Sequence, residues 1–211
     1  MTRVKVCGIT SERDLQAAVD AGADAVGLLV DVPVDSPREI SPGRAADLAG
    51  SVPPFVTTVL VTMPDDPGRV VELARSVDPD AVQVHGTGRG DLAFLASTLD
   101  ADLVRAVDAT SERPADYDGV ADALLLDAAA TGGTGETHDW ERAGDLVDGL
   151  DSPVVLAGGL DPANVAEAVH AVDPFAVDVA TGVEATGGEK DADAVRSFVA
   201  NARRARRIVS P

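Results

Sequence analysis

An eightfold alternation between short apolar runs and segments with helical spacing dominates the sequence. The apolar runs lie at 3–7, 25–30, 55–61, 81–85, 102–107, 123–127, 153–157 and 175–180. Nearly continuous apolar runs of this length are typical of parallel strands buried on both faces. Eight such strands, each followed by a helix or a helical turn, predict a single-domain (β/α)8 TIM barrel with eight parallel strands over residues 1–211.

A weak internal repeat supports this interpretation. Four of the predicted strands begin alike, at Ala23-Asp24-Ala25-Val26, Pro79-Asp80-Ala81-Val82, Ala121-Asp122-Ala123-Leu124 and Pro174-Phe175-Ala176-Val177. Each of these segments follows a predicted helix and a tight turn. Repeated use of one strand-helix unit favours a closed barrel over a doubly wound sheet, which rarely needs eight regular alternations.

Helix start signals fall between the strands. Ser11 and Asp14 have the spacing of a capping box, and Ser41-Pro42 and Asp66-Pro67 look like helix N-caps followed by a first helical residue. Helices are predicted over about 11–21, from 42, over 66–77, 91–99 and 139–147, from 161, and over 191–206, with a helical turn at 114–117.

The composition indicates which partners the protein can bind and in which cellular compartment it works. A net charge of −19 argues against nucleic-acid binding, and we interpret the cluster Arg203, Arg204, Arg206 and Arg207 as the solvated end of a helix. No apolar run is long enough for a membrane span, and a single cysteine fits a reducing cytoplasm. Two lysines against fifteen arginines, with abundant aspartate, suggest a salt-adapted, halophilic cell. The composition does not distinguish a monomer from a homodimer.

Cys7, the only cysteine, ends the first predicted strand. Loops that leave the carboxyl ends of parallel strands build the site in barrels of this kind. A thiol at such a position can act as a base or a nucleophile when a cation lies nearby. The alternative is a small buried core residue, and Cys7 alone does not decide between the two.

Other polar residues are expected at the same mouth. Asp127 ends the sixth strand, where it is a candidate general acid or, alternatively, a loop cap. Arg38 follows Pro37 and is suited to bind a substrate carboxylate, although a surface salt bridge explains it equally well. His85 ends the fourth strand as a proton-transfer or structural group, and Asp178 lies near the end of the eighth.

Three glycine-rich segments are candidate phosphate sites after the sixth, seventh and eighth strands. They contain Gly132 and Gly133, then Gly158 and Gly159, then Thr181 and Gly182. Backbone N–H groups in such loops bind phosphate, so a phosphorylated small-molecule substrate is favoured. His138 and His170 lack ligand-like spacing, and no metal site is predicted.

Together these motifs resemble the phosphoribosylanthranilate isomerase family of tryptophan biosynthesis. The resemblance runs over the full chain and rests on Val4-Lys5-Val6-Cys7-Gly8-Ile9-Thr10, Ser36-Pro37-Arg38, Gln83-Val84-His85-Gly86, Leu126-Asp127, Gly132-Gly133-Thr134-Gly135, Asp139-Trp140, Ala157-Gly158-Gly159-Leu160, Val177-Asp178-Val179, Thr181-Gly182-Val183-Glu184 and Lys190-Asp191. There are two departures from the family pattern: the chain has Gly27-Leu28-Leu29-Val30 near the end of the second strand, where an aromatic residue is common, and Ala180-Thr181 where two serines are usual.

The resemblance implies an Amadori rearrangement of N-(5'-phosphoribosyl)anthranilate without a cofactor. By the pattern of the family, Asp127 would protonate the ring oxygen, Cys7 would remove the C2 proton, and Arg38 would hold the anthranilate carboxylate. His85 and Asp178 are expected to contact substrate.

The same residues were weighed against two alternative functions. A histidine-pathway ribonucleotide isomerase uses aspartates at the ends of its first and fifth strands, whereas the first strand here ends on Cys7. A non-catalytic phosphate-binding barrel would not require Cys7, Arg38 and Asp127 together.

Overall fold

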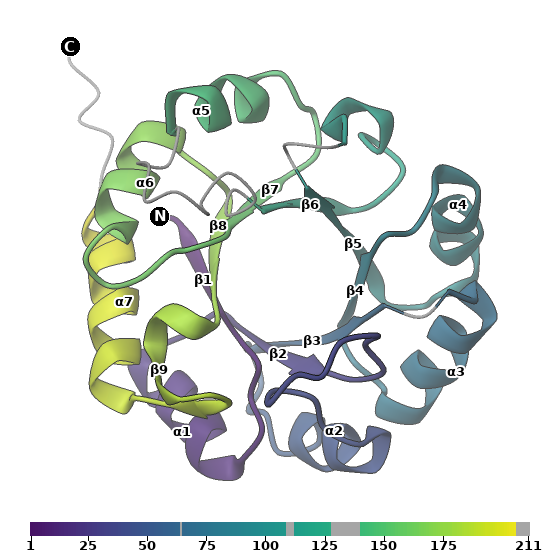
Figure 1. Ribbon diagram of the computed structural model, residues 1–211, viewed down its shortest axis with the longest axis horizontal. Helices are drawn as coiled ribbons and strands as arrows, with labels where there is room; N and C mark the ends of the chain where they lie inside the picture. Colours follow the sequence, from purple (N-terminus) through teal and green to yellow (C-terminus); the bar gives the residue numbers. More distant parts are fainter. Residues whose placement is uncertain (64, 109–111, 128–139, 206–211) are drawn as a thin grey trace.

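Eight parallel strands pair in chain order and close into a barrel, with the helices outside it (Figure 1). The computed structural model describes residues 1–63, 65–108, 112–127 and 140–205. The strands are β1 Arg3–Cys7, β2 Ala25–Leu29, β3 Thr57–Thr62, β4 Ala81–His85, β5 Asp102–Asp108, β6 Ala123–Asp127, β7 Val154–Ala157 and β8 Ala176–Val179. The predicted (β/α)8 fold class is therefore confirmed, with the first strand paired to the eighth.

The helices of the described residues begin near the predicted start signals in most cases. They are α1 Glu12–Ala21, α2 Pro42–Ala49, α3 Pro67–Val77, α4 Arg89–Thr98, α5 Trp140–Asp148, α6 Val165–Val172 and α7 Ala192–Arg204. Ser11, Ser41 and Asp66 each accept a backbone N–H at a helix N-terminus, as their spacing predicts. None of these helices combines the length and the apolar character that a membrane crossing requires.

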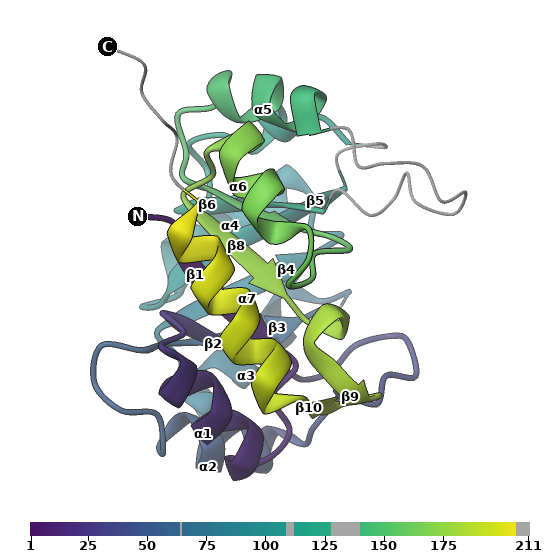
Figure 2. The same cartoon turned by 90° about the vertical axis from the view of Figure 1, so that its left-hand side faces the viewer.

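Between β5 and β6 the described residues contain only the 3₁₀ turn η1 Pro114–Asp116, where a helical turn was expected. The last helix, α7, packs against the first, α1, which completes the outer ring (Figure 2). Arg203 of α7 is less solvated than expected, since its Nη2 atom donates to the Gly22 carbonyl oxygen and to Asp24. Arg206 and Arg207 lie outside the described residues.

The structure departs from the sequence prediction at the starts of the third strand and the sixth helix and at a hairpin after β8. The third strand starts at Thr57, because Phe55 has a φ of 71° and is fully exposed. The sixth helix starts at Val165 instead of 161, because Asp161 Oδ1 accepts the N–H groups of Ala163 and Asn164 in a turn. The hairpin of β9 Glu184–Thr186 and β10 Glu189–Lys190, after the 3₁₀ turn η3 Thr181–Val183, was not predicted.

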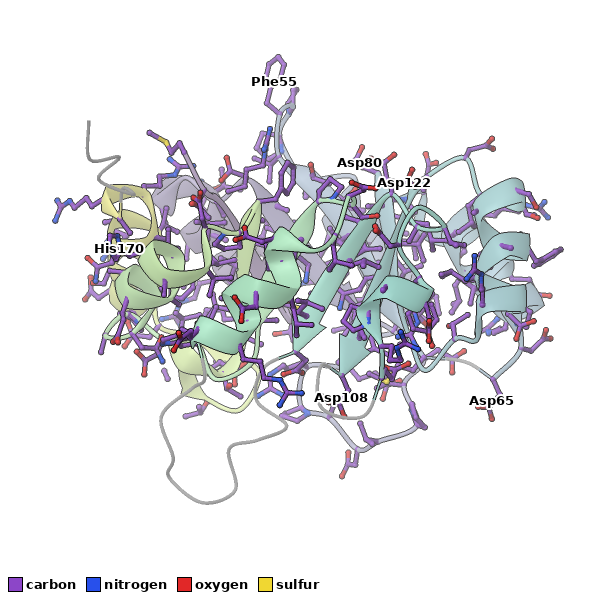
Figure 3. The ribbon with its side chains drawn as sticks, turned by 90° about the horizontal axis from the view of Figure 1, so that it is seen from above. Phe55, Asp65, Asp80, Asp108, Asp122 and His170 are labelled. Carbon is purple, nitrogen blue, oxygen red and sulfur yellow. The ribbon has the colours of Figure 1, made fainter. Side chains whose placement is uncertain are left out.

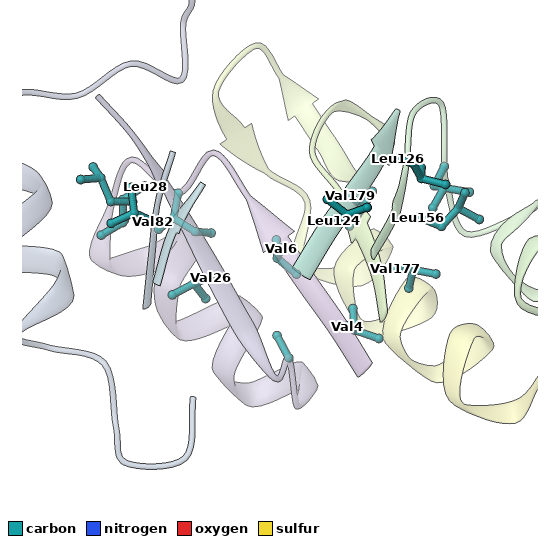
Figure 4. Close-up of a cluster of buried hydrophobic side chains, with 14 of the residues drawn as sticks. Val4, Val6, Val26, Leu28, Val82, Leu124, Leu126, Leu156, Val177 and Val179 are labelled. Carbon is teal, nitrogen blue, oxygen red and sulfur yellow. The ribbon is translucent and has the colours of Figure 1, made fainter. Parts of the chain in front are cut away.

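The core has an outer and an inner part. Outward-facing strand residues such as Val4, Leu124 and Val177 pack against the helices in one continuous apolar cluster (Figure 4). Inside the barrel the apolar residues form two smaller clusters, one around Leu125 and one around Val59. The barrel interior also contains buried polar residues, among them Lys5, Gln83 and Asp178.

The repeated aspartates have a structural role at the amino-terminal ends of the strands. Asp24, Asp80 and Asp122 precede β2, β4 and β6, and each accepts a backbone N–H from the preceding strand, of Val4, Thr58 and Leu103 at 2.8, 2.7 and 2.8 Å. Figure 3 shows Asp80 and Asp122 at one end of the barrel with Phe55, while Asp65 and Asp108 lie at the opposite end. The repeat therefore ties strand starts together, and the predicted site lies at the other end.

Candidate active site

Cys7 is the last residue of β1 and lies inside the barrel, 9% exposed. It packs against Gly27 of β2 so closely that a Cβ atom there would lie 2.7 Å from the sulfur atom. Burial raises the pKa of the Cys7 thiol, Lys5 and Lys190 oppose this effect, and Asp178 adds to it. The thiol therefore lies between Gly27 on one side and the charged groups of Lys5, Lys190 and Asp178.

Lys5 and Asp178 form a buried ion pair below Cys7. The distance from Lys5 Nζ to Asp178 Oδ2 is 3.0 Å, and both residues are under 10% exposed. They face one another because Lys5 and Asp178 are paired positions of β1 and β8. Asp178 Oδ1 is buried and has no hydrogen-bond partner among the described residues, so it is available to a ligand.

His85, at the end of β4, is neutral in this environment. Burial, together with the charges of Lys5 and Arg105, lowers the pKa of His85 to about 4. Gln83 Nε2 lies 2.9 Å from His85 Nε2, and an amide nitrogen can only donate there. His85 Nε2 is therefore the acceptor, and Nδ1 carries the proton of the neutral ring.

Asp127 ends β6, where it is paired in register with Asp108 of β5 and Ala157 of β7. It is partly buried and lines a cavity of about 420 Å³ at the carboxyl ends of the strands. The other residues of the lining are His85, Gly86, Ala106, Val107, Asp108 and Glu112. The predicted acid and the predicted histidine therefore share one cavity.

Arg38 lies in the loop after β2 and is held by Glu184 of the hairpin. Its Nε and Nη2 atoms are 2.7 and 2.9 Å from the two carboxylate oxygens. Lys190 Nζ lies 2.9 Å from the same carboxylate, and although burial acts in the opposite direction, these hydrogen bonds lower the pKa of Glu184. Glu184 occupies one edge of the guanidinium, which leaves the edge formed by Nη1 and Nη2 for a ligand.

The hairpin is fixed against the loops that follow β1 and β2. Gly188 has a φ of 84°, and a Cβ atom there would lie 2.3 Å from the Pro37 carbonyl oxygen. Its own carbonyl oxygen accepts from Thr10 Oγ1 at 2.9 Å, and the Lys190 N–H donates to Asp14 at 3.1 Å. Residues far apart in the chain therefore set the position of Arg38.

Two of the three predicted phosphate loops lie together. Gly158 and Gly159 follow β7 with φ values of 92° and 63°, which favour glycine. Thr181 and Gly182 open η3 after β8, and a Cβ atom on Gly182 would lie only 2.0 Å from the Leu160 carbonyl oxygen. The third predicted pair, Gly132 and Gly133, lies outside the described residues.

No sequence pattern assigned an individual role to Lys5, Gln83, Glu184 or Lys190. For the two lysines the signal was their scarcity, because Lys5 and Lys190 are the only lysines in the chain and both are buried in ion pairs at the site. Within the ranges that the structure describes, no group of three or more acidic, histidine or cysteine side chains could hold a metal ion.

Comparisons with known proteins agree with this geometry. Residues 4–201 match the family described as N-(5'phosphoribosyl)anthranilate (PRA) isomerase. The chain is 62% identical over 203 residues to an N-(5'-phosphoribosyl)anthranilate isomerase of Natronomonas pharaonis, covering 94% of this chain and 97% of the relative.

Two crystal structures are similar over 96% of this chain and 99% of theirs. One is a phosphoribosyl anthranilate isomerase in complex with reduced 1-(o-carboxyphenylamino)-1-deoxyribulose 5-phosphate, with a TM-score of 0.82 and 36% identity. The other contains monomers generated from the dimeric isomerase of Thermotoga maritima, with a TM-score of 0.83 and 35% identity. With the family match over most of the chain, these similarities show that the chain belongs to the N-(5'-phosphoribosyl)anthranilate isomerase family.

Proposed function

We propose that the chain catalyses the Amadori rearrangement of N-(5'-phosphoribosyl)anthranilate to 1-(2-carboxyphenylamino)-1-deoxyribulose 5-phosphate, a step of tryptophan biosynthesis, by general acid and base catalysis. The observation that carries the mechanism is the placement of Cys7 and Asp127 at the carboxyl ends of β1 and β6, with the glycine loops after β7 and β8 between them. An acid and a base are thus available on one mouth beside a site suited to phosphate.

The reaction proceeds in two proton transfers. Asp127 donates a proton to the furanose ring oxygen, the C1–O bond breaks, and the anthranilate nitrogen forms a C1=N bond. The Cys7 thiolate then removes the C2 proton, and the C–H electrons form C1=C2 while the nitrogen becomes neutral. The resulting enolamine tautomerises to the aminoketone, so no atom is gained or lost and no cofactor or metal is required.

Substrate binding uses the groups around these two catalysts. The free edge of Arg38 binds the anthranilate carboxylate, with Glu184 fixing its orientation. Backbone N–H groups near Gly158, Gly159 and Gly182, with the Thr181 hydroxyl and the segment of Gly132 and Gly133, bind the phosphate. Asp178 Oδ1 and the neutral His85 contact the sugar hydroxyls.

The proposal is tested by following the anthranilate fluorescence of the substrate at high salt concentration. We expect the parent to lose this signal with turnover and Cys7→Ser to lose activity, because a hydroxyl is far too weakly acidic to supply the base. Binding of a phosphorylated product analogue should stay near the parent value. Activity of Cys7→Ser within about tenfold of the parent would contradict the role of Cys7, since general base catalysis normally contributes more.

We also propose that the protein forms a homodimer through the amino-terminal ends of its barrel. Phe55 is fully exposed and extends beyond this end (Figure 3), and Phe175, which is 44% exposed, lines the hollow there. The same end contains a hollow of about 280 Å³, which is open because β2, β4, β6 and β8 each begin with an inward alanine: Ala25, Ala81, Ala123 and Ala176. An exposed aromatic side chain and an apolar hollow on one face fit a second copy of the chain.

Light scattering after gel filtration at high salt tests the dimer. We expect a dimeric parent and a monomeric Phe55→Asp variant, while Phe94→Asp, at a 46% exposed position on α4, stays dimeric. A monomeric parent, or a dimeric Phe55→Asp variant, would contradict this interface. We further propose that residues 1–211 act as one barrel domain in the reducing cytoplasm of a salt-adapted cell, in keeping with the single cysteine and the scarce lysine.

A further inference from the structure

Lys5 and Cys7 are inward-facing neighbours on β1, two positions apart on the same face of the strand. Lys5 is 6% exposed, and its side chain has one fixed direction because Nζ lies 3.0 Å from Asp178 Oδ2 on the adjacent strand. The register of β1 with β8 pairs the two residues directly. The ammonium group is therefore fixed inside the barrel, below the thiol.

Charged groups face Cys7 from several elements. They are Lys5 on β1, Asp178 on β8, Lys190 on β10 and Arg38 in the loop after β2. The β2 neighbour, Gly27, carries no charge, and the β4 residue His85 is neutral. Of the two lysines, Lys5 lowers the pKa of the thiol more than Lys190 does.

We propose that Lys5 is the positioning residue that makes Cys7 usable as a base, because its ammonium group, fixed in place by Asp178, stabilises the Cys7 thiolate. A thiol that is buried against Gly27 without a nearby cation stays protonated at neutral pH.

Lys5 does not serve as the base itself. Burial disfavours its charged form, but Asp178 and the Cys7 thiolate outweigh burial and raise the pKa of Lys5 above its ordinary value. The group therefore stays an ammonium at neutral pH. Asp178 has a double role in this arrangement, since Oδ2 holds Lys5 while Oδ1 has no described partner and can face the substrate.

The inference rests on the proposed role of Cys7, so the test uses a readout that does not depend on turnover. Cys7 is the only cysteine, and its alkylation by iodoacetamide over a range of pH reports its thiolate directly. We expect Lys5→Met to lower the alkylation rate at neutral pH at least tenfold, equal to a rise of about one unit in the apparent pKa of Cys7. Turnover should fall by a similar factor and recover at higher pH, with KM within about threefold of the parent.

Two further variants separate charge from packing. Lys5→Arg keeps the charge and should alkylate within about threefold of the parent, and Lys190→Met removes the other lysine and should cost less than Lys5→Met. If Lys5→Met does not fold, Lys5→Gln replaces it, because an amide still donates to Asp178 without a charge, and the same loss is expected.

Alkylation of Lys5→Met or Lys5→Gln within about twofold of the parent would overturn the proposal, because one pKa unit corresponds to tenfold. If Lys5→Arg lost as much of the alkylation rate as Lys5→Met, the effect would come from packing and not from charge. If Lys190→Met lost as much, Lys5 would have no larger effect on the thiol than the other lysine. Either result would also overturn the proposal. A shifted alkylation profile with an active Cys7→Ser variant would instead refute the catalytic role of Cys7 and leave the effect of Lys5 on the thiol established.

Discussion

Replacement of His85 by glutamine should make the protein more resistant to mild acid. The pKa of His85 is lowered to about 4 in the folded protein, mainly by burial, while an unfolded chain titrates near 6.5. Above both values the imidazole is neutral in both states and has no effect. As the pH falls below about 6.5, the unfolded state takes up a proton that the folded state refuses, so stability falls until the pH reaches about 4.

The size of this effect follows from the shift. A difference of about 2.5 units corresponds to roughly 3 kcal/mol below pH 4, at 1.36 kcal/mol for each unit. Between about pH 7.5 and pH 5.0 the parent should lose about 2 kcal/mol of unfolding free energy through this residue alone. This window is useful because the ordinary pKa values of aspartate and glutamate lie below it.

The assay is chemical denaturation of parent and His85→Gln at high salt over this pH range. Glutamine keeps an acceptor oxygen for Gln83 Nε2 and cannot take up a proton, so its stability should change by about 2 kcal/mol less than that of the parent. His170→Asn is the matched control, because His170 is exposed on α6 (Figure 3), and it should follow the parent. Equal losses in the parent and in His85→Gln would refute the neutral, buried assignment of His85.

Three further predictions concern the site. Asp127→Asn should lower kcat by roughly 10²- to 10⁴-fold at an unchanged melting temperature, because an amide cannot protonate the ring oxygen; a destabilised but active variant would make Asp127 a loop cap. Arg38→Ala should raise KM by about tenfold or more, since a charge-assisted bond contributes roughly 1.5–3 kcal/mol, and an unchanged KM would contradict the carboxylate role. Gly182→Ala should weaken inhibition by inorganic phosphate at least about tenfold, because a Cβ atom 2.0 Å from the Leu160 carbonyl oxygen forces the two loops apart, whereas Gly43→Ala, with no neighbour within 4 Å, should leave it unchanged.

The strand ends could be located from the sequence because they depend on local patterns. An apolar run that stops at a polar residue, followed by a helix start signal, defined β1, β4 and β6 at their carboxyl ends within one residue. This is why Cys7, His85 and Asp127 were expected at one mouth, where the closed barrel places them. The boundaries of β3 and α6 were wrong because Phe55 and Asp161 adopt turn conformations that no periodicity reports.

The pairing of charges could not be derived in the same way. Arg38 was considered either as a ligand for substrate or as a surface salt bridge, but its partner Glu184, in a hairpin 146 positions along the chain, could not be foreseen from the sequence. Lys5 and Asp178 are 173 positions apart and meet only because β1 and β8 close the barrel.

The sequence by itself determined the eight strands, the fold class and the polar residues at the strand ends, because these follow from hydrophobic runs and turn residues a few positions long. Only the tertiary structure decided which residues face the interior. A parallel strand buried on both faces has no alternation of polar and apolar residues, so its sequence does not distinguish inside from outside. Closure of the barrel makes that choice, and with it the ion pair of Lys5 and Asp178 beneath Cys7.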